Sequence, residues 1–502
     1  MYYMAGTGGA TSPASSHACV PPARPRRAED AALGPWLHCS EGPEGLLVET
    51  DRLGMHPVFH TTLNTGPAVA ERISELLARG ADPTTDDDAI ALFLRLGFFV
   101  EQDTPFLHIR AFPPGEGARW SATAAWQPAT PTPLPGIDER ISLDAAIDGF
   151  ITYFREAIRT AVETIEPSET ALPLSGGRDS RNIALELHHQ GFRPGLIFTQ
   201  RFGPSSPDGD APVARALGRR LGWTVQEVPA SAQPCADEFD KNRRFDCLSD
   251  EHAWFAPCSR FIAQHRPRWI FDGLAGGALA TGTFLRPHWQ ALWRKGDPRQ
   301  LLQAINEDHY GAREWALERL LGRQALARWS RDRAVARLNA ALVPYRDDPR
   351  GIERFMFWNR TRREIAPFVP RYSAPARTIT PYLAPGLFEF LWSLPSHILR
   401  SAQGSLHDLA LHRAYPHMAD LPFAGHQPPR DPGAHARAMA RSLLRTPALW
   451  QAESIPDWAW LLPRLAAAAA SKPLAVQMLP YLGWLVWFVS LQAMIRSHGR
   501  RL

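Results

Sequence analysis

Cysteine is scarce in this chain, with five residues among 502. They form no C-x-x-C pair, and no histidine cluster lies at the spacing of a zinc site. A sparse, odd set of cysteines gives no indication of a disulfide framework and is typical of a reducing compartment. We therefore expect a cytoplasmic protein.

Long apolar runs are also missing. The longest, Leu482–Ile495, is shorter than the ~18–20 residues that span a bilayer, and Ser490 and Gln492 interrupt it. We expect a buried core helix there rather than a membrane segment, and the first residues lack the pattern of a signal peptide. Charge of one sign is not in excess, because the chain has 55 basic and 51 acidic residues. Composition thus gives no reason to expect a nucleic-acid partner.

Shifts in composition and periodicity predict four parts. Residues 1–34, rich in Ala, Pro, Gly and Ser, are expected to be a disordered tail. Residues 35–135 should form a small α+β module and residues 140–430 an α/β domain. Residues 431–502 should form a helical C-terminal extension.

Apolar spacing predicts the first elements. Alternating or apolar runs favour strands at Gly45–Thr50 and His56–Thr61, whereas helical spacing favours helices at Ala68–Arg79 and Asp86–Leu96. The α/β domain then begins with a strongly amphipathic helix at Ser142–Glu163.

Strands and helices alternate after that helix. The predicted order is a strand at Thr170–Leu174, a helix from Asp179, a strand at Gly195–Thr199, a helix at Pro212–Leu221 and a strand at Thr224–Pro229. This β-α-β-α-β order indicates a parallel, doubly wound sheet. A further strand is expected at Arg268–Asp272, and the pattern from about Trp289 onward is mostly helical.

The main chemical signal is the segment Leu174–Arg181 (LSGGRDSR), which follows an apolar strand and opens a helix. Gly176 and Gly177 let the backbone approach an anion, whose charge the N–H groups and dipole of the following helix stabilise. Ser175 and Ser180 add hydroxyl donors. The segment thus has the properties of a phosphate-binding loop.

Asp179 has a different role in this loop. A carboxylate repels phosphate, so Asp179 makes chemical sense as a ligand of Mg²⁺ that bridges to the phosphate. A tight strand–helix turn capped by serine is the structural alternative. The full S-G-G-x-D-S pattern between a strand and a helix is far more specific than a pair of glycines, and it is neither a P-loop nor a dinucleotide fingerprint.

S-G-G-x-D-S resembles the pyrophosphate loop of N-type ATP-pyrophosphatases, and more of the chain is similar to the asparagine synthetase family. The resemblance runs from about residue 45 to about residue 425. It is carried by Asp51–Pro57 (DRLGMHP) and Gly97–Gly115, similar to the glutamine-hydrolysing domain, and by Pro381–Leu383, Ser393–Pro395 and Tyr415–Pro422, similar to the synthetase domain. It implies an adenine-nucleotide α-hydrolase-like fold that uses ATP and Mg²⁺.

The resemblance also assigns site residues. Asp179 would be the metal ligand and a catalytic residue. The nucleotide would be bound by Leu174, Ser175, Gly176, Gly177, Asp179, Ser180, Asp272 and Gly273.

The amide-donor part departs from the family. A glutamine-dependent synthetase needs a cysteine exposed at its N-terminus, but position 2 is Tyr, and Cys19 and Cys39 are not terminal. Residues 35–135 thus resemble a degenerate glutaminase-like module. We expect no glutamine hydrolysis, so that ammonia or an existing amine is the nucleophile.

A second departure lies in Phe271–Gly282 (FDGLAGGALATG). Asp272 and Gly273 match the family's nucleotide-contacting pair, but Gly277 stands where the family has an Asp that helps to hold Mg²⁺. Leu274 stands where asparagine synthetases have Glu and β-lactam-forming relatives have Tyr. Loss of one carboxylate should weaken the metal site, unless Asp272 or one of Asp208 and Asp210 compensates.

Leu274 argues against ordinary asparagine synthesis and against β-lactam formation. With a glutaminase module that lacks its nucleophile, it resembles lasso peptide cyclases. The resemblance implies a carbon–nitrogen ligase that adenylates a peptide or small carboxylate, releases pyrophosphate and AMP, and works with a precursor peptide and a companion protease. Two alternatives stay open: an ammonia-dependent asparagine synthase, and a catalytically impaired homologue that only binds.

Four further groups are weaker candidates. Arg362, with Arg360 and Arg363, grips pyrophosphate or an acidic substrate, or else lies on a solvated helix face. No lysine occurs between Lys295 and Lys472, so His426 or Arg430 is a candidate for the position of the family's catalytic lysine. The remaining candidates are Asp208 and Asp210, either functional or helix-dipole partners, and Glu251-His252, more readily explained as a cap.

Overall fold

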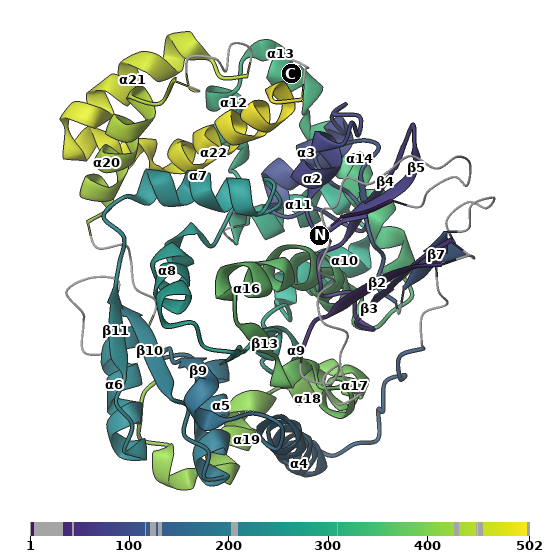
Figure 1. Cartoon of the computed structure of the whole chain (residues 1–502), viewed down its shortest axis with the longest axis vertical. Coiled ribbons are helices and arrows are strands. Elements are labelled where there is room, and N and C mark those ends of the chain that lie inside the picture. Colours follow the sequence, from purple (N-terminus) through teal and green to yellow (C-terminus); the bar gives the residue numbers. More distant parts are fainter. Residues whose placement is uncertain are drawn as a thin grey trace.

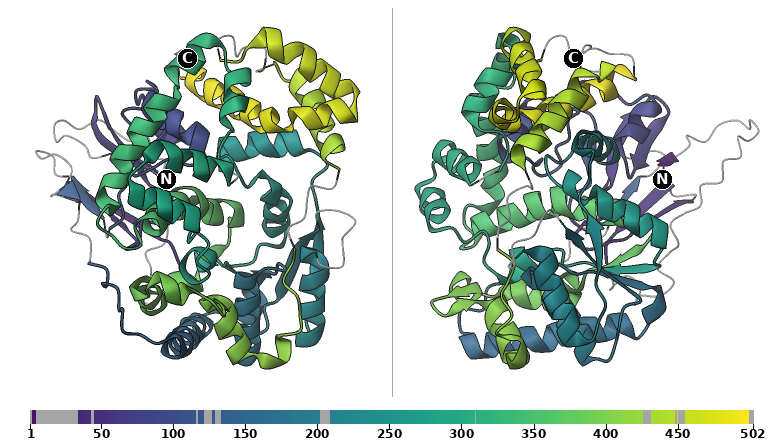
Figure 2. Two further views of the ribbon diagram at one scale, coloured as in Figure 1. Left: turned by 180° about the vertical axis from the view of Figure 1, so that it is seen from behind. Right: turned by 90° about the vertical axis from the view of Figure 1, so that its left-hand side faces the viewer.

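The computed structural model describes most of the chain (Figures 1 and 2). The described residues are 2–4 and 34–498, apart from gaps at 43–44, 116, 121–126, 129–132, 202–208, 309, 426–430, 448 and 450–454. A parallel sheet lies at one end of the molecule, and the C-terminal helices lie at the opposite end. The N-terminal strands lie beside the middle of the molecule (Figure 1).

Five short strands form the parallel sheet. In spatial order they are β11 (Gln226–Pro229), β10 (Leu196–Arg201), β9 (Thr170–Pro173), β12 (Trp269–Phe271) and β13 (Arg377–Ile379). Every neighbouring pair is parallel, which confirms the sheet type expected from the order of the elements. The sequence did not indicate β13, because three residues carry no periodicity of their own.

Helices bury both faces of this sheet. One face is covered by α4 (Leu143–Val162), α5 (Arg178–His189) and α6 (Asp210–Leu221), and the other by α8 (Ala256–His265). Leu172 and Ile197 pack with the first group, whereas their chain neighbours Ala171 and Phe198 pack with α8. This alternation follows from the two-residue period of a strand. Helices on both faces make the sheet doubly wound.

The chain reverses its direction across the sheet at β9. It passes from β9 to β10 and β11 on one side, and then returns to place β12 and β13 on the other side. The connections that leave β9 and β12 diverge, which opens a crevice beyond the carboxyl ends of these two strands. Open α/β sheets bind their ligands at such a switch point.

The prediction of mostly helical structure from Trp289 onward is confirmed. These helices include α10 (Pro287–Lys295), α11 (Pro298–Glu307), α12 (Glu314–Leu320), α13 (Arg323–Arg328), α14 (Arg331–Leu342), α15 (Gly351–Met356), α16 (Ala366–Ser373), α17 (Pro385–Ser393), α18 (Ser396–Leu399) and α19 (Leu406–Ala414). They are followed by α20 (Pro432–Leu444), α21 (Trp458–Ala470) and α22 (Lys472–Arg496). A hairpin of β14 (Arg400–Ser401) and β15 (Gly404–Ser405) interrupts the series.

The N-terminal part contains two antiparallel sheets and two helices. One sheet has the order β1 (Tyr2–Met4), β5 (Gly66–Ala70), β4 (Phe59–Leu63), β6 (Arg110–Ala111), and the other β2 (Leu37–Gly42), β3 (Gly45–Thr50), β7 (Ala118–Trp120), β8 (Gln127–Pro128). The helices are α2 (Ile73–Ala78) and α3 (Asp87–Leu96). Because β1 pairs with β5, residues 2–4 correct the prediction that the whole of 1–34 is a disordered tail; residues 5–33 lie outside the described part.

The helix predicted at Ala68–Arg79 is wrong in its first part. Residues up to Ala70 belong to β5, and α2 starts only at Ile73. A two-residue turn pairs Leu63 with Gly66, so the chain folds back along β4 before any helix can begin. Pairing between strands has overridden the helical spacing of the apolar residues.

The N-terminal helices and the C-terminal helices share one hydrophobic core. Helix α3 is buried along almost its whole length and packs against α14. Phe93 of α3 stacks on Trp487 of α22 with ring centroids 4.9 Å apart. The boundary predicted near residue 431 therefore does not separate two cores, although the helical character of 431–502 is confirmed in the described residues.

Helix α22 is long and apolar enough to cross a bilayer. It packs against α7 (Pro234–Arg244), α20 and α21, and more than half of its most apolar window (56%) is buried. The segment Leu482–Ile495 forms the most buried part of this helix, as expected for a core helix. In the part of the chain that the structure describes, α22 is the only helix long and apolar enough to cross a bilayer.

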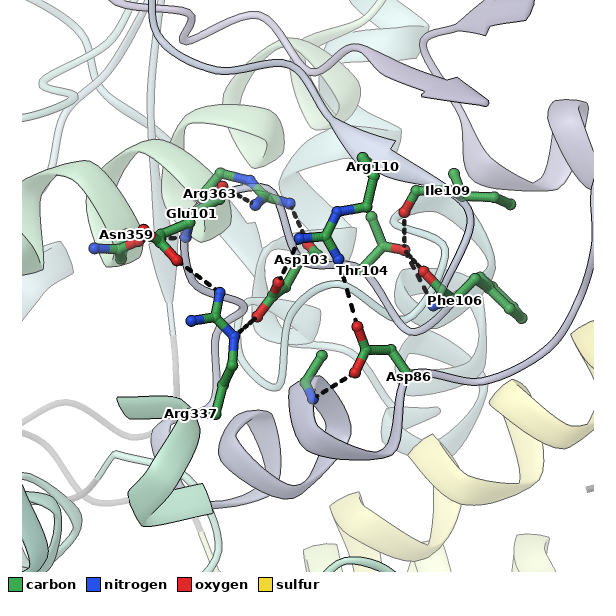
Figure 3. Close-up of polar contacts among 11 residues, drawn as sticks. Asp86, Glu101, Asp103, Thr104, Phe106, Ile109, Arg110, Arg337, Asn359 and Arg363 are labelled. Atoms are coloured by element: carbon green, nitrogen blue, oxygen red, sulfur yellow. Dashed lines mark hydrogen bonds and ion pairs between the residues drawn. The ribbon is translucent and has the colours of Figure 1, made fainter. Parts of the chain in front are cut away.

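The N-terminal part is joined to the rest by buried arginines (Figure 3). A π-helical segment, η4 (Phe357–Ile365), carries Arg363, which donates to the backbone oxygens of Glu101 and Asp103. From α14, Arg337 forms ion pairs of 2.7 Å with the carboxylates of the same two residues. Since the Asp103 side chain is only 2% exposed, its charge depends on these partners.

We expect Arg337→Met to lower the free energy of unfolding by roughly 1–3 kcal/mol, because it leaves the buried Asp103 carboxylate with Arg110 as its one remaining arginine partner in the described residues. Arg333→Met on the same helix is the matched control, since the pair of Arg333 with Asp88 is half-exposed on both sides, where solvent screens it, and should contribute little. Urea denaturation measures both variants. Equal effects would contradict the structural role of Arg337.

Candidate functional site

Two loops meet at the switch point of the sheet. One leaves β9 and begins α5, and the other leaves β12 and begins the short helix α9 (Gly276–Ala280). They approach so closely that a Cβ atom on Gly273 would lie 2.6 Å from Cβ of Asp179, and one on Gly276 2.5 Å from its Oδ1. Glycine is therefore required at both positions, and Asp179 lies between the loops.

The Asp179 carboxylate joins the two loops. The N–H of Gly277 donates to Oδ2 at 3.2 Å. The other oxygen, Oδ1, is buried and accepts no hydrogen bond in the described structure, although Nε2 of His407 lies 3.3 Å away. A buried, negatively charged oxygen without a donor is the environment that a cation would satisfy.

His407 and Tyr382 support Asp179 from behind. His407 is fully buried, and its Nε2 lies 2.8 Å from the hydroxyl of Tyr382. Burial, together with the charge of Asp179, raises the pKa of Tyr382 well above its usual value, so the phenol stays neutral. No sequence pattern indicates His407. Tyr382 belongs to the Pro381–Leu383 motif, but its hydroxyl contacts the backbone of Asp179 from 203 positions away, which no local pattern can indicate.

The glycine-rich loop is held by its own serines and by Asp210. Ser175 Oγ lies 2.9 Å from Ser180 Oγ and accepts from the N–H of Gly177. The N–H of Gly176 donates to Asp210 Oδ1 at 2.8 Å. Asp210 thus fixes the loop from the first turn of α6, and the N–H groups at the start of α5 remain directed at the crevice without intrahelical acceptors.

A segment of later chain closes one side of the loop. The N–H of Ala424 donates to the Gly176 oxygen at 2.9 Å. The ring of Phe423 lies between two guanidinium groups, 4.3 Å from Arg178 and 4.2 Å from Arg181. His426, Arg430 and Asp208, three candidates from the sequence, lie outside the described residues, so their placement relative to this loop stays a prediction.

Asp272 is the second carboxylate at the switch point. Its Oδ1 accepts from the N–H of Leu274 at 2.7 Å. Burial, and then the charge of Asp179, raise the pKa of Asp272 from 3.8 to about 6. Two neighbouring carboxylates whose charges repel each other in this way fit a divalent cation.

The two leucines of these loops, Leu174 and Leu274, are part of the hydrophobic core. Leu174 is buried in the core, and its N–H donates to the backbone of Phe198. Leu274 is 3% exposed, so its side chain fills the core under the crevice instead of contacting a ligand. Leu274 therefore supplies no acid or base to the crevice, as the sequence indicated.

A cleft of about 640 Å³ opens in front of Asp179. Its charged lining includes Arg178 and Asp408, which form an ion pair of 2.5 Å. The other lining residues are Asp179, Gly277, Thr281, Thr283 and residues 400–405 of the β14–β15 hairpin. The cleft therefore presents one unpaired carboxylate, that of Asp179, beside hydroxyl groups and Arg400.

The cluster of Arg360, Arg362 and Arg363 does not lie at this cleft, which corrects both interpretations of Arg362. The guanidinium of Arg362 is buried and donates to the backbone oxygens of Gly54 (3.1 Å) and Phe112. It therefore neither lies on a solvated face nor grips a phosphate. The π-helical segment packs against the N-terminal part, whose loop carbonyls take these donors, and sequence periodicity cannot show such packing.

Glu251 and His252 also lie away from the cleft, next to Glu364 of the π-helical segment. Their ligand-type atoms lie within 4.8 Å of one another. Arg360 neutralises the group, with a 3.3 Å contact to Glu251 and a 3.6 Å contact to Glu364. Burial lowers the pKa of His252 to about 3 and raises that of Glu364 to about 8. The cluster is a buried polar network between α7 and the π-helical segment.

No family model and no curated protein matches this chain. The chemistry of the crevice is therefore argued from its own geometry. A glycine-rich loop, a helix start and a buried carboxylate without a donor meet at the switch point of a parallel sheet. That combination suits an anion accompanied by a divalent cation. Cys235, Cys247 and Cys258 are buried and take no part in it.

We expect Asp272→Asn to stabilise the metal-free protein above about pH 6 by roughly 1–3 kcal/mol. The folded pKa of Asp272, about 6, lies above its ordinary value of 3.8, so its ionised form destabilises the folded state as pH rises through this window. Below about pH 4 both states are protonated and the variants should be equally stable. Thermal unfolding across this range measures the effect, and a pH-independent difference would contradict it.

Proposed function

We propose that the protein is an ATP-dependent carbon–nitrogen ligase with an adenine-nucleotide α-hydrolase-like fold. The observation that carries the proposal is the donor-free Oδ1 of Asp179, at the head of a glycine-rich loop and helix start at the switch point. On this proposal the enzyme adenylates a carboxylate and transfers the acyl group to an amine.

The reaction has two balanced steps. A carboxylate oxygen of the substrate attacks the α-phosphorus of ATP, and the bond to the bridging oxygen breaks with release of pyrophosphate. An amine nitrogen then attacks the acyl carbon, loses its proton and displaces AMP. The first N–H groups of α5 bind the pyrophosphate, and the seryl hydroxyls of the loop orient it.

The residues present fit Mg²⁺, which would neutralise charge on the pyrophosphate when bound. Asp179 would hold it through Oδ1, and Asp272 would supply a second carboxylate. His407 and Tyr382 lie behind the Asp179 carboxylate, with Nε2 of His407 3.3 Å from its Oδ1. The Gly277 N–H fixes its other oxygen.

The amine comes with the substrate on this proposal. Among the described residues that line the cleft there is no cysteine that could release ammonia from glutamine. A tethered amine gains from proximity, which favours a peptide that closes its own ring through a macrolactam bond. A precursor peptide and a companion protease in the cytoplasm belong to this proposal.

A second candidate is a homologue that binds a peptide or a partner enzyme but does not catalyse a reaction. Gly277 favours it, because no carboxylate stands at the position of the family's second metal ligand. The bond from the Gly176 N–H to Asp210 favours it too, since that donor is not free for a phosphate. If this candidate is right, the wild-type protein should not bind Mg·ATP.

We expect Asp179→Ala to abolish pyrophosphate release from ATP in the presence of a candidate precursor peptide, and to weaken Mg·ATP binding at least about tenfold. The reason is the loss of the one carboxylate whose Oδ1 is free for a cation. Asp420→Ala is the control, because Asp420 is exposed and pairs only with Arg220. Calorimetry and a pyrophosphate assay measure both variants; equal activity of Asp179→Ala and wild type would overturn the proposal.

We expect Gly277→Asp to tighten Mg²⁺ binding roughly tenfold, the order produced by an added carboxylate ligand. A Cβ atom at this position would lie 3.7 Å from Thr283 Oγ1 and 3.8 Å from Asp179 Oδ2, which are ordinary contacts, so the side chain fits. Gly277→Asn is the matched control without charge. The rise of melting temperature on adding Mg²⁺ measures the effect, and the same rise in both variants would sink the metal site at Asp179.

A further inference from the structure

The cleft in front of Asp179 continues into a second cavity of about 1030 Å³. The two cavities share Thr283, Arg400, Ser401 and Ala402, so they are parts of one groove. The first part ends at Asp179, and the second extends along α10 and the start of α18. A ligand whose reacting group lies at Asp179 can therefore reach the second part.

The second part is lined by basic side chains, and we name it the basic arm. Its described lining contains no aspartate or glutamate. The cationic or potentially cationic residues of this arm are Arg286, His288, Arg294, His397 and Arg400.

Most of this positive charge is not neutralised within the protein. Arg286 and His288 lie 3.5 and 2.9 Å from the carboxylate of Asp308, which compensates one charge. Arg294 and Arg400 are exposed and form no ion pair with any residue in the described part of the chain. In a chain with a net charge of only +4, two unpaired guanidinium groups in one groove are a local excess.

We propose that the substrate carries acidic groups beyond the carboxylate that reacts, and that the basic arm binds them. This inference rests on the proposed ligase function. The occupant to which we commit is an acidic stretch of a peptide, whose reacting carboxylate lies at Asp179 and whose further carboxylates contact Arg294 and Arg400. Guanidinium groups bind carboxylates through paired, charge-assisted hydrogen bonds, which gives both affinity and orientation.

The lining favours a peptide over a single-stranded nucleic acid. Proteins that bind single strands combine a positive groove with aromatic rings on which bases stack. Among the described residues that line the two parts of the groove there is no Phe, Tyr or Trp. Hydroxyl groups and backbone amides around Thr283 and Ser401 suit the main chain of a peptide instead.

The test is the affinity of a fluorescein-labelled, alternating Glu-Gly peptide for the full-length protein, measured by fluorescence anisotropy. We expect the double variant Arg294→Gln/Arg400→Gln to bind this peptide at least about tenfold more weakly than wild type, and the salt dependence of binding to decrease. The control Arg445→Gln alters an exposed arginine at the end of α20 and should bind like wild type. Thermal unfolding checks that the variants are folded.

Three outcomes would overturn the inference. The first is that an uncharged Gln-Gly control peptide of equal length binds as tightly as the Glu-Gly peptide. The second is that the double variant binds the Glu-Gly peptide like wild type. The third is that a single-stranded oligonucleotide displaces the peptide at equal charge concentration. Mg·ATP binding is measured separately with the wild-type protein. Mg·ATP binding without peptide binding refutes the basic arm alone, whereas peptide binding without Mg·ATP binding refutes the ligase proposal alone.

Discussion

The position of the Asp179 carboxylate constrains the whole crevice. One of its oxygens accepts from the Gly277 N–H, which joins the loop after β12 to the helix after β9. The two loops approach within the distance that only glycine allows at positions 273 and 276. Because β9 and β12 are neighbours with divergent connections, this contact can form only at the switch point of the sheet. The groove, its hydroxyl groups and its basic arm are all arranged around that contact.

A second constraint lies far from the crevice, in the arginines of the π-helical segment. Arg362 and Arg363 donate to main-chain oxygens of the N-terminal part, where they replace contacts that loops would otherwise make with water. Buried guanidinium groups fully engaged in this way cannot also bind a substrate. The N-terminal part therefore serves as a structural support that contributes α3 to the shared core.

The sequence predicted those features that depend on neighbouring residues. Apolar runs and glycines placed β9, the loop and α5 correctly, because a strand–turn–helix unit is defined by its own residues. The sequence did not predict contacts between segments that lie far apart in the chain. His407 reaches Asp179 across more than two hundred positions, and nothing near either residue in the sequence indicates the pairing. The burial of Arg362 was missed for the same reason, since a cluster of basic residues is as compatible with a buried interface as with a ligand site.

The charges of the groove suggest why a glycine at position 277 suits this protein. Asp408 is neutralised by Arg178, so Asp179 is the carboxylate among the described lining residues of the cleft that no arginine neutralises. An aspartate at position 277 would add a second negative charge beside Asp179 and would repel any carboxylate that enters the cleft. That repulsion would oppose the attraction of Arg400, which lines the same cleft. Glycine at position 277 therefore keeps the cleft open to an acidic ligand.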